Sequence, residues 1–176
     1  RLRDNGSTEF IDFTGNAAAG NNYGLEVTAD YQVNEAFSLY GNLGLLQTEY
    51  QDFINSAGDN LDGREQAHAP EYQFTLGTDL RINDQLLLNL NVQGKDDFYF
   101  SDSHSVRSDR FELLNASLTW SMENWRATLW GRNLTDTDYY VRGFYFGNDP
   151  RDNYTAKGYT QLGEPRRFGL TVNLDF

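Results

Sequence analysis

The sequence predicts an all-β fold in which antiparallel strands form a transmembrane β-barrel. Three observations predict this fold. Apolar and polar residues alternate in segments of about ten residues, short and long connectors take turns, and aromatic residues gather near the segment ends. A strand of about ten residues crosses a bilayer at a tilt, whereas strands of soluble proteins usually have about five or six residues.

Seven segments alternate clearly enough to be expected as strands. They cover residues 23–33, 37–50, 72–82, 86–93, 114–120, 125–129 and 167–176. Residues 8–14 are a weaker candidate for an eighth strand. Residues 37–50 are less regular, because Tyr40 and Leu46 fall on the face that should be polar. The last segment alternates strictly, and its apolar face carries Phe168, Leu170, Val172, Leu174 and Phe176.

The connectors between these segments alternate in length. Residues 33–36, 83–84 and 121–124 are short and turn-like, whereas the long connectors cover residues 15–22, 51–69, 96–109 and 135–165. In a chain of antiparallel strands this order places the short turns at one end of the sheet and the long loops at the other. Transmembrane barrels have this arrangement, with short periplasmic turns and long extracellular loops.

The apolar face of each strand fits either lipid or a protein core. Strand length, charges on the polar faces and aromatic residues near the strand ends favour lipid outside and a water-filled lumen inside. A soluble carbohydrate-binding β-sandwich is the alternative, because it also pairs an apolar face with a solvated one. The aromatic residues expected at the rims are Tyr23, Tyr31, Tyr50, Tyr72, Phe98, Tyr99, Phe100, Phe111, Trp120, Trp125, Phe168 and Phe176.

The composition of the 176 residues excludes several classes of function. With 26 acidic against 14 basic side chains and a net charge of −12, the chain lacks the basic surface that nucleic acid requires. The absence of Cys excludes disulfides, thiolate metal sites and a Cys nucleophile. We find no catalytic constellation, and we expect neither enzymatic activity nor a cofactor.

Two motifs near the C-terminus resemble those of a known family. Residues 125–136 read W-R-A-T-L-W-G-R-N-L-T-D and are followed by Tyr139 and Tyr140. Residues 163–170 read G-E-P-R-R-F-G-L and lead into the alternating segment that ends at Phe176. Upstream, residues 22–27 look like a strand start that recurs in the same family. Together these elements resemble the C-terminal end of a TonB-dependent outer-membrane receptor.

This resemblance implies a 22-stranded barrel with an N-terminal plug domain in its lumen. Residues 1–176 would be the C-terminal part of that barrel and supply about seven or eight strands, with the plug and the earlier strands absent. The implied function is active import of a scarce ligand, most often a ferric siderophore, across the outer membrane of a Gram-negative bacterium. The implied partners are outer-membrane lipid, the small-molecule ligand and, through the plug, the TonB complex.

The family likeness also implies an orientation and an assembly signal. Phe176 would lie at the periplasmic end, which places the short turns in the periplasm and the long loops outside the cell. The outer-membrane assembly machinery would read the terminal strand through Phe168, Leu170, Val172, Leu174 and Phe176. The alternative within the barrel class is a self-closed eight-stranded barrel with an adhesion or structural role, since small closed barrels have about eight strands.

The longest connector, residues 135–165, contains the candidate ligand-binding residues. Aromatic rings and guanidinium groups at the mouth of a barrel suit a metal chelate or a sugar, through stacking and charge pairing. The alternative is that these side chains pack on one another within an ordered loop. The candidates are Tyr140, Arg142, Tyr145, Arg151 and Tyr154.

Other polar loop residues are expected to be solvated. His68 and His104, the two histidines of the chain, lie in expected loops without a motif around them. Carboxylates at positions 96, 97 and 102, and at positions 149 and 152, could ligate Ca²⁺, but no EF-hand pattern accompanies them. We therefore expect no metal site.

Overall fold

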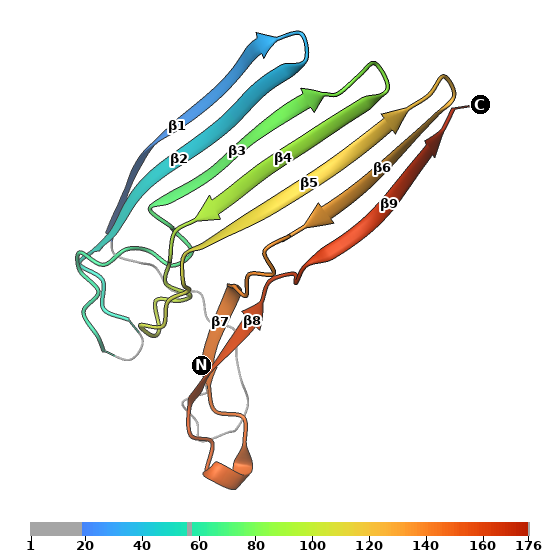
Figure 1. The fold of residues 1–176 in the computed structure, drawn as a ribbon. Coiled ribbons are helices and arrows are strands. Elements are labelled where there is room, and N and C mark those ends of the chain that lie inside the picture. The colour runs from blue at the N-terminus through green and yellow to red at the C-terminus, as the bar shows by residue number, and fades with distance from the viewer. Residues whose placement is uncertain (1–18, 56–57, 176) are drawn as a thin grey trace.

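A computed structural model describes residues 19–55 and 58–175, and these residues form nine β-strands and one short 3-10 helix (Figure 1). None of the described residues belongs to a helix long and apolar enough to cross a membrane. The weaker strand candidate at residues 8–14 lies outside the described residues. The strands are β1 (Ala19–Asn34), β2 (Phe37–Gln51), β3 (Tyr72–Arg81), β4 (Leu86–Lys95), β5 (Phe111–Ser121), β6 (Trp125–Arg132), β7 (Tyr140–Phe146), β8 (Lys157–Leu162) and β9 (Arg167–Leu174).

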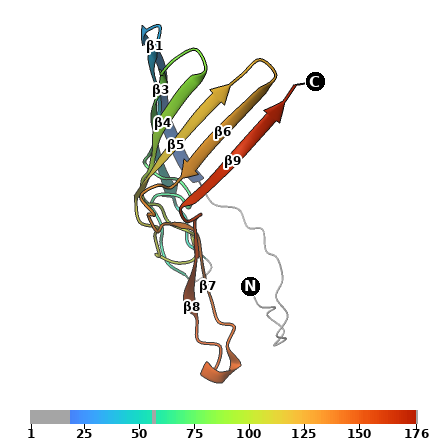
Figure 2. The ribbon, with the colours of Figure 1, turned by 45° about the vertical axis from the view of Figure 1, so that its right-hand side comes forward.

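Seven of these strands form one antiparallel sheet in the order β1-β2-β3-β4-β5-β6-β9. The prediction of an all-β antiparallel fold with alternating short and long connections is confirmed. The sheet is curved and open in both views (Figure 2). Its edge strands are β1 and β9, which do not pair with each other within the described part of the chain. The self-closed eight-stranded barrel is therefore not the fold of these residues.

The outer face of the sheet is apolar and uncovered. Leu170, Val172 and Leu174 on β9 are 66%, 54% and 58% exposed. The only other sheet among the described residues, the β7–β8 hairpin, extends from the long-loop end and does not cover this face (Figure 2). The exposed strip therefore argues against a two-layer sandwich. Phe176, which belongs to the same predicted strip, lies outside the described residues.

The height of the apolar strip matches a membrane. Side chains from Tyr23 to Val33 on β1 span about 25 Å, at about 3.3 Å per residue and a tilt of about 40°. Above Tyr23 the outer face of the β1–β2 pair becomes polar, with Asn21 next to Glu49, whose carboxylate accepts a hydrogen bond from the Asn21 amide at 3.0 Å. The two strands thus continue beyond the apolar belt toward the long loops.

The irregular residue Tyr40 has a local explanation on the inner face. Tyr40 lies opposite Gly77 in the β2–β3 register, and a Cβ at Gly77 would come within 2.2 Å of the Tyr40 ring. The Tyr40 hydroxyl accepts a hydrogen bond from the side-chain amide of Asn89 at 2.9 Å. An inward aromatic ring is therefore accommodated by a glycine on one neighbouring strand and a polar partner on the next.

Residues 135–165, expected as one long loop, contain a second hairpin. β7 and β8 pair antiparallel, and the 3-10 helix η1 (Pro150–Asp152) lies at the tip. Asp149 caps this helix by accepting the backbone N–H of Arg151 at 2.9 Å. The sequence pattern missed these strands because their residues do not alternate between an apolar and a polar face. Four of the six β8 residues are polar or glycine, and β7 is mainly aromatic.

The buried apolar core lies in the long loops and not in the sheet. Phe98 and Phe100, expected at the membrane rim, are 1% and 4% exposed and pack edge to face at 5.6 Å. Leu61 and Ala69 from the connector between β2 and β3 complete this core. The rim prediction was therefore wrong for Phe98 and Phe100, because the loops fold over these rings. It fits Tyr23, Tyr31, Trp120 and Phe168, which are exposed on the outer face.

Candidate functional site

The site is built on the base of the β7–β8 hairpin. Asn133, directly after β6, is 3% exposed and has the left-handed backbone conformation, φ 48°. Its side-chain amide donates to the carbonyl oxygens of Thr137 at 2.9 Å and Glu164 at 3.1 Å, and its Oδ1 accepts the Thr137 backbone N–H. One asparagine thus joins the start and the end of the hairpin.

Two further contacts fix the same base. The Asp136 carboxylate accepts the backbone N–H of Arg166 at 3.0 Å and forms an ion pair with the Arg166 guanidinium at 3.3 Å. Tyr139 lies against Gly163, where a Cβ would approach the ring to 2.0 Å, and the Tyr139 hydroxyl accepts the Glu164 backbone N–H. The two C-terminal motifs therefore meet in space and hold the hairpin at a set position.

A chain of side-chain hydrogen bonds links this base to the inner wall. Asn115 donates to Asn91 at 2.9 Å, Asn91 donates to Asn89 at 3.0 Å, and Asn89 donates to Asp79 at 2.8 Å. The Oδ1 of Asn115 also accepts the Asn133 backbone N–H at 3.0 Å. These side chains are thus linked in one hydrogen-bonded chain that supports the base of the hairpin.

The loops that precede β3 and β5 form a cap beside the hairpin. We use this term for residues 52–55, 58–69 and 96–109. The guanidinium carbons of Arg64 and Arg107 lie 3.9 and 4.3 Å from the centre of the Tyr99 ring. Arg64 donates to the carbonyl oxygens of Ser101 and His104, and Arg107 pairs with Glu65 at 2.8 Å and with Asp97. These cation–π contacts and charge pairs join the two loops into one unit.

A pocket of about 270 Å³ lies between the cap and β7. Its walls come from both units and combine aromatic rings, hydroxyl groups, imidazoles and one guanidinium. The lining residues are His68, Phe100, Ser101, Ser103, His104, Arg142, Gly143, Phe144, Tyr145 and Phe146. Among the described residues no carboxylate lines it, although the chain has 26 acidic side chains.

Both histidines line this pocket. His68 is exposed, as expected for a solvated loop residue, whereas His104 is half-buried. The His68 backbone is left-handed, φ 57°, and its ring lies 5.3 Å from that of Phe98. The His104 ring lies 5.7 Å from that of Tyr145 on β7, and its Nδ1 accepts the Val106 backbone N–H at 3.2 Å. Sequence spacing could not reveal the pair, because only the packing of two separate loops brings them together.

The surroundings of His104 favour its neutral form. Because Nδ1 accepts a hydrogen bond, the proton of the neutral ring lies on Nε2. Nε2 is covered by protein and has no hydrogen-bond partner among the described residues. Partial burial and then the nearby Arg64 guanidinium lower the pKa of His104 below its usual 6.5, against the opposing effect of Asp102.

The structure separates the five predicted ligand residues into two groups. Arg142 and Tyr145 line the pocket, and Tyr140 is half-buried at the first position of β7. Arg151 and Tyr154 lie at the hairpin tip, where Arg151 forms a bidentate pair with Asp149 that lowers the pKa of that carboxyl group. Arg142 has no ion-pair partner in the described part of the chain and lies over the Phe144 ring at 5.0 Å.

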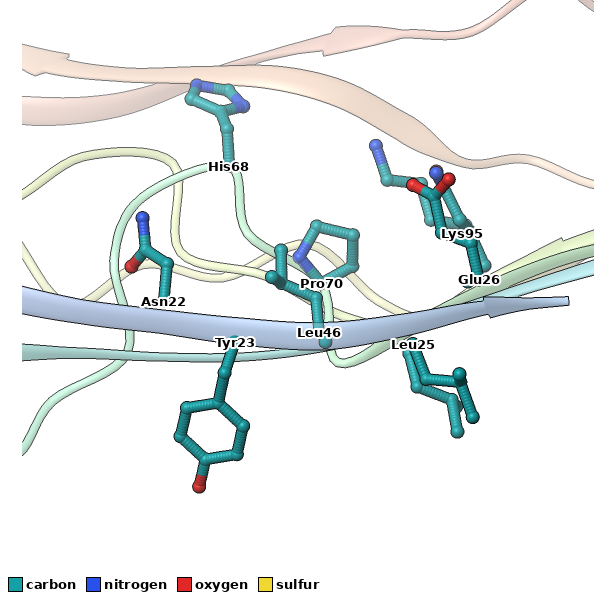
Figure 3. A pocket seen from close by; sticks show the side chains of 12 residues that line it. Asn22, Tyr23, Leu25, Glu26, Leu46, His68, Pro70 and Lys95 are labelled. Carbon is teal, nitrogen blue, oxygen red and sulfur yellow. The ribbon is translucent and has the colours of Figure 1, made fainter.

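A larger pocket of about 470 Å³ lies on the inner wall beneath the cap. Figure 3 shows Asn22, Glu26, Lys95 and His68 on one side of β1, whereas Tyr23 and Leu25 point to the other side, the apolar face. Leu46, the second irregular residue of the sequence pattern, lies here near Pro70 (Figure 3). His68 lines both pockets, so it lies where the external pocket meets the lumen side.

The acidic residues considered for Ca²⁺ have other partners. Asp97 pairs with Arg107, Asp149 with Arg151 and Asp152 with Lys157. Within residues 19–55 and 58–175 no group of three or more His, Cys, Asp or Glu side chains could hold a metal ion. These carboxylates instead stabilise the loops that carry them.

Comparisons with known proteins agree with this architecture. The family model described as "TonB dependent receptor-like, beta-barrel" matches residues 2–134. The chain is similar to the ferric yersiniabactin uptake receptor FyuA from Yersinia pestis, with a TM-score of 0.72 and 20% identity over 89% of this chain and 24% of that one. It is also similar to the ferric-catecholate import receptor Fiu from E. coli K12 in its closed form, with a TM-score of 0.66 and 20% identity over 89% of this chain and 21% of that one.

A third similar structure is the ferric citrate transporter FecA in the unliganded form. Here the TM-score is 0.68 and the identity 19%, over 89% of this chain and 24% of that one. At these identities the likeness shows the fold. The chain spans about a quarter of the length of FyuA and of FecA.

Proposed function

The chain belongs to the TonB-dependent receptor β-barrel family, and from this premise we propose that it forms the C-terminal part of an outer-membrane receptor that imports a ferric siderophore. In this proposal residues 1–176 are barrel wall and external loops, and a plug domain and further strands come from the rest of the receptor. The protein is a transporter and not an enzyme, and it lies in the outer membrane of a Gram-negative bacterium.

The observation that carries this proposal is the family match combined with the two faces of the sheet. The outer face is an uncovered apolar strip that lipid would cover, and the inner face is lined by amides, hydroxyls and charges that suit a lumen. The open edges at β1 and β9 require neighbouring strands in a membrane, because unpaired backbone groups are costly in lipid.

The ligand class rests on two lines of support. FyuA, Fiu and FecA are named as receptors or transporters of iron complexes. At the loop end of the present chain, Arg142 and Tyr145 line a pocket whose donors and rings suit a metal chelate. Arg151, Tyr154 and Tyr140 remain candidates for ligand contact from outside this pocket.

The proposed partners follow from the same architecture. TonB would act through the plug, and the outer-membrane assembly machinery would read Phe168, Leu170, Val172, Leu174 and Phe176. Phe168, Leu170, Val172 and Leu174 are exposed on the outer face of β9. Exposure on an edge strand is compatible with recognition by another protein and with later contact with lipid.

Uptake of radiolabelled iron tests the function. Cells that express the full-length receptor and lack their other iron receptors are offered a panel of ferric siderophores under iron limitation. We expect uptake of at least one complex, and loss of that uptake when TonB is deleted or the proton gradient is collapsed. Uptake that survives both treatments would contradict the proposal, as would an absence of uptake for every ferric complex.

A further inference from the structure

The pocket between the cap and β7 is small for a complete iron chelate. Its volume is about 270 Å³, whereas sites for drug-sized ligands usually have about 300–1,000 Å³. The pocket therefore has room for one arm of a larger ligand. Phe100, Phe144 and Phe146 contribute to its lining, so a flat, ring-bearing arm fits it best.

The charge of the pocket is unusual for this chain. Arg142 brings a guanidinium that no carboxylate neutralises within the described residues, and no Asp or Glu of that part of the chain lines the pocket. Hydroxyl groups of Ser103 and Tyr145 add further donors. Asp102 lies behind the lining, where it accepts a hydrogen bond from the Ser101 hydroxyl at 3.3 Å, and it does not pair with Arg142. A cation without a counter-ion, placed among donors, favours an anionic oxygen group.

The hairpin provides an internal contrast. Arg151 is also exposed on the same hairpin, yet its Nε and Nη2 donate to the two carboxylate oxygens of Asp149 at 2.9 Å, and it lies outside the pocket. Its charge is already paired. The two arginines thus differ in whether they can offer a free guanidinium to a ligand.

We propose that this pocket is an entry subsite that selects one arm of the ligand, a planar ring carrying an anionic oxygen group, through Arg142. The assignment rests on the proposed function only in that the arm belongs to an imported ligand. His68 lines both this pocket and the inner-wall pocket, so the two pockets share one side chain of the cap. An aryl carboxylate or a phenolate has the required chemistry.

Benzoate and benzamide are suitable probes because they have nearly the same shape and differ in charge. Binding of each to the purified full-length receptor is measured by saturation-transfer NMR and titration. We expect benzoate to bind about tenfold more tightly than benzamide, as a charge-assisted bidentate contact predicts. Equal affinity for the two probes, or no binding of benzoate, would overturn the proposal.

The matched variants are Arg142→Gln and Arg151→Gln. Arg142→Gln should remove the preference for benzoate and leave benzamide binding unchanged, whereas Arg151→Gln should leave both affinities as they are. Both side chains are exposed, so neither change should affect folding. Folding is verified by electrophoresis, in which an unheated folded barrel and a boiled sample differ in mobility. Loss of benzoate binding in Arg151→Gln to the same extent as in Arg142→Gln would contradict a local site and point to general surface charge.

This experiment can fail independently of the proposed function. If TonB-dependent iron uptake is intact but Arg142→Gln does not change the preference for benzoate, the subsite is wrong and the transport function stands. If benzoate binds as expected but no ferric complex is imported, the subsite stands and the transport function is wrong.

Discussion

The seven-stranded wall and the loop end of this chain are ordered by different forces. In the wall, adjacent strands pair along their lengths, and the apolar side chains remain exposed, as with Leu170 at 66%. At the loop end the side chains bury one another, as with Phe98 at 1%, and specific polar contacts such as those of Asn133 close the connections. One region depends on a surrounding membrane for its apolar contacts, whereas the other has a core of its own.

This difference explains what can be inferred from a sequence. Alternation with a period of two identifies a wall that separates lipid from water, because every second side chain meets the same medium. The β7–β8 hairpin at the loop end does not separate lipid from water. Its two strands therefore show no such alternation. Mutations in the two regions should therefore act in different ways. In the wall, the loss of stability should depend on the depth of the residue in the bilayer and on the face that it occupies. At the loop end, it should depend on the particular contact that is lost.

The largest expected effect comes from a charge on the lipid face. Leu76→Arg on β3 replaces a side chain that is 59% exposed on the apolar face, and it should destabilise the folded barrel by about 2–4 kcal/mol, as for arginine near the middle of a bilayer. Thr75→Arg is the control, because this neighbour lies at the same depth on the inner face. Denaturant titrations of the receptor in lipid vesicles would compare them. An equal loss in both variants would contradict the assignment of the faces.

The next effect tests whether one residue holds the hairpin base. Asn133→Ala removes three side-chain hydrogen bonds and places alanine at φ 48°, which should destabilise the base by about 2–3 kcal/mol. We expect faster amide hydrogen exchange and proteolysis in residues 135–165 with an intact barrel. Asn173→Ala is the control, since Asn173 is exposed on β9 and its side chain makes no hydrogen bond within the described residues. Matching behaviour of the two variants would contradict the role of Asn133.

The same asparagine shows how far the motif could be interpreted from the sequence alone. Residues 125–136 and 163–170 indicated the family, but their sequence says nothing of the bonds from Asn133 to Glu164 or from Asp136 to Arg166. Those bonds exist because β7 and β8 return the chain to its starting point. The motifs are thus structural, and the ligand candidates lie on the hairpin that they support.

The candidate site was predictable only in part, for a related reason. Arg142 and Tyr145 were candidates because aromatic and basic residues cluster in one connector, and both line the pocket. Arg151 fits the same composition but is paired with Asp149. His68 and His104 come from two other connectors, and composition cannot show that separate loops pack against one another. Residue type alone therefore identified the connector that contributes to the pocket, but not the full set of residues that line it.

A smaller effect is expected where the hairpin touches the cap. A Cβ at Gly143 on β7 would approach the Phe100 ring to 2.2 Å, so Gly143→Ala should weaken this contact by about 1–3 kcal/mol through overpacking. Gly158→Ala on β8 is the control, because no atom lies within 4 Å of the added methyl group. Hydrogen–deuterium exchange of the segments around Phe100 and Gly143, measured by mass spectrometry, should increase only in Gly143→Ala. The affinity for benzoate should fall in the same variant. Unchanged exchange would show that the hairpin does not rest on Phe100.

The smallest effect is a pH dependence confined to the cap. Since the pKa of His104 is lowered from 6.5 in the folded cap, an opened cap binds more protons than a closed one as the pH falls below 6.5. The stability that the neutral ring contributes is present above pH 6.5 and is lost toward the lowered pKa. Protonation of Nδ1 also removes the hydrogen bond that this atom accepts from the Val106 backbone N–H. The charge of Arg64 disfavours this protonation, and the charge of Asp102 favours it.

The Val106 amide reports this change directly. Its hydrogen-exchange protection should fall as the pH is lowered through this range, relative to the Ser108 amide, which donates to the Phe98 carbonyl at 2.9 Å and to no titrating group. In His104→Gln the ratio of the two protection factors should no longer depend on pH. A pH-dependent ratio that persists in this variant would assign the titration to another group in the cap, and a constant ratio in the unmodified receptor would show that His104 does not couple to the loop. The wall strands do not contact the His104 ring, so the protection factors of their amides should not follow this titration.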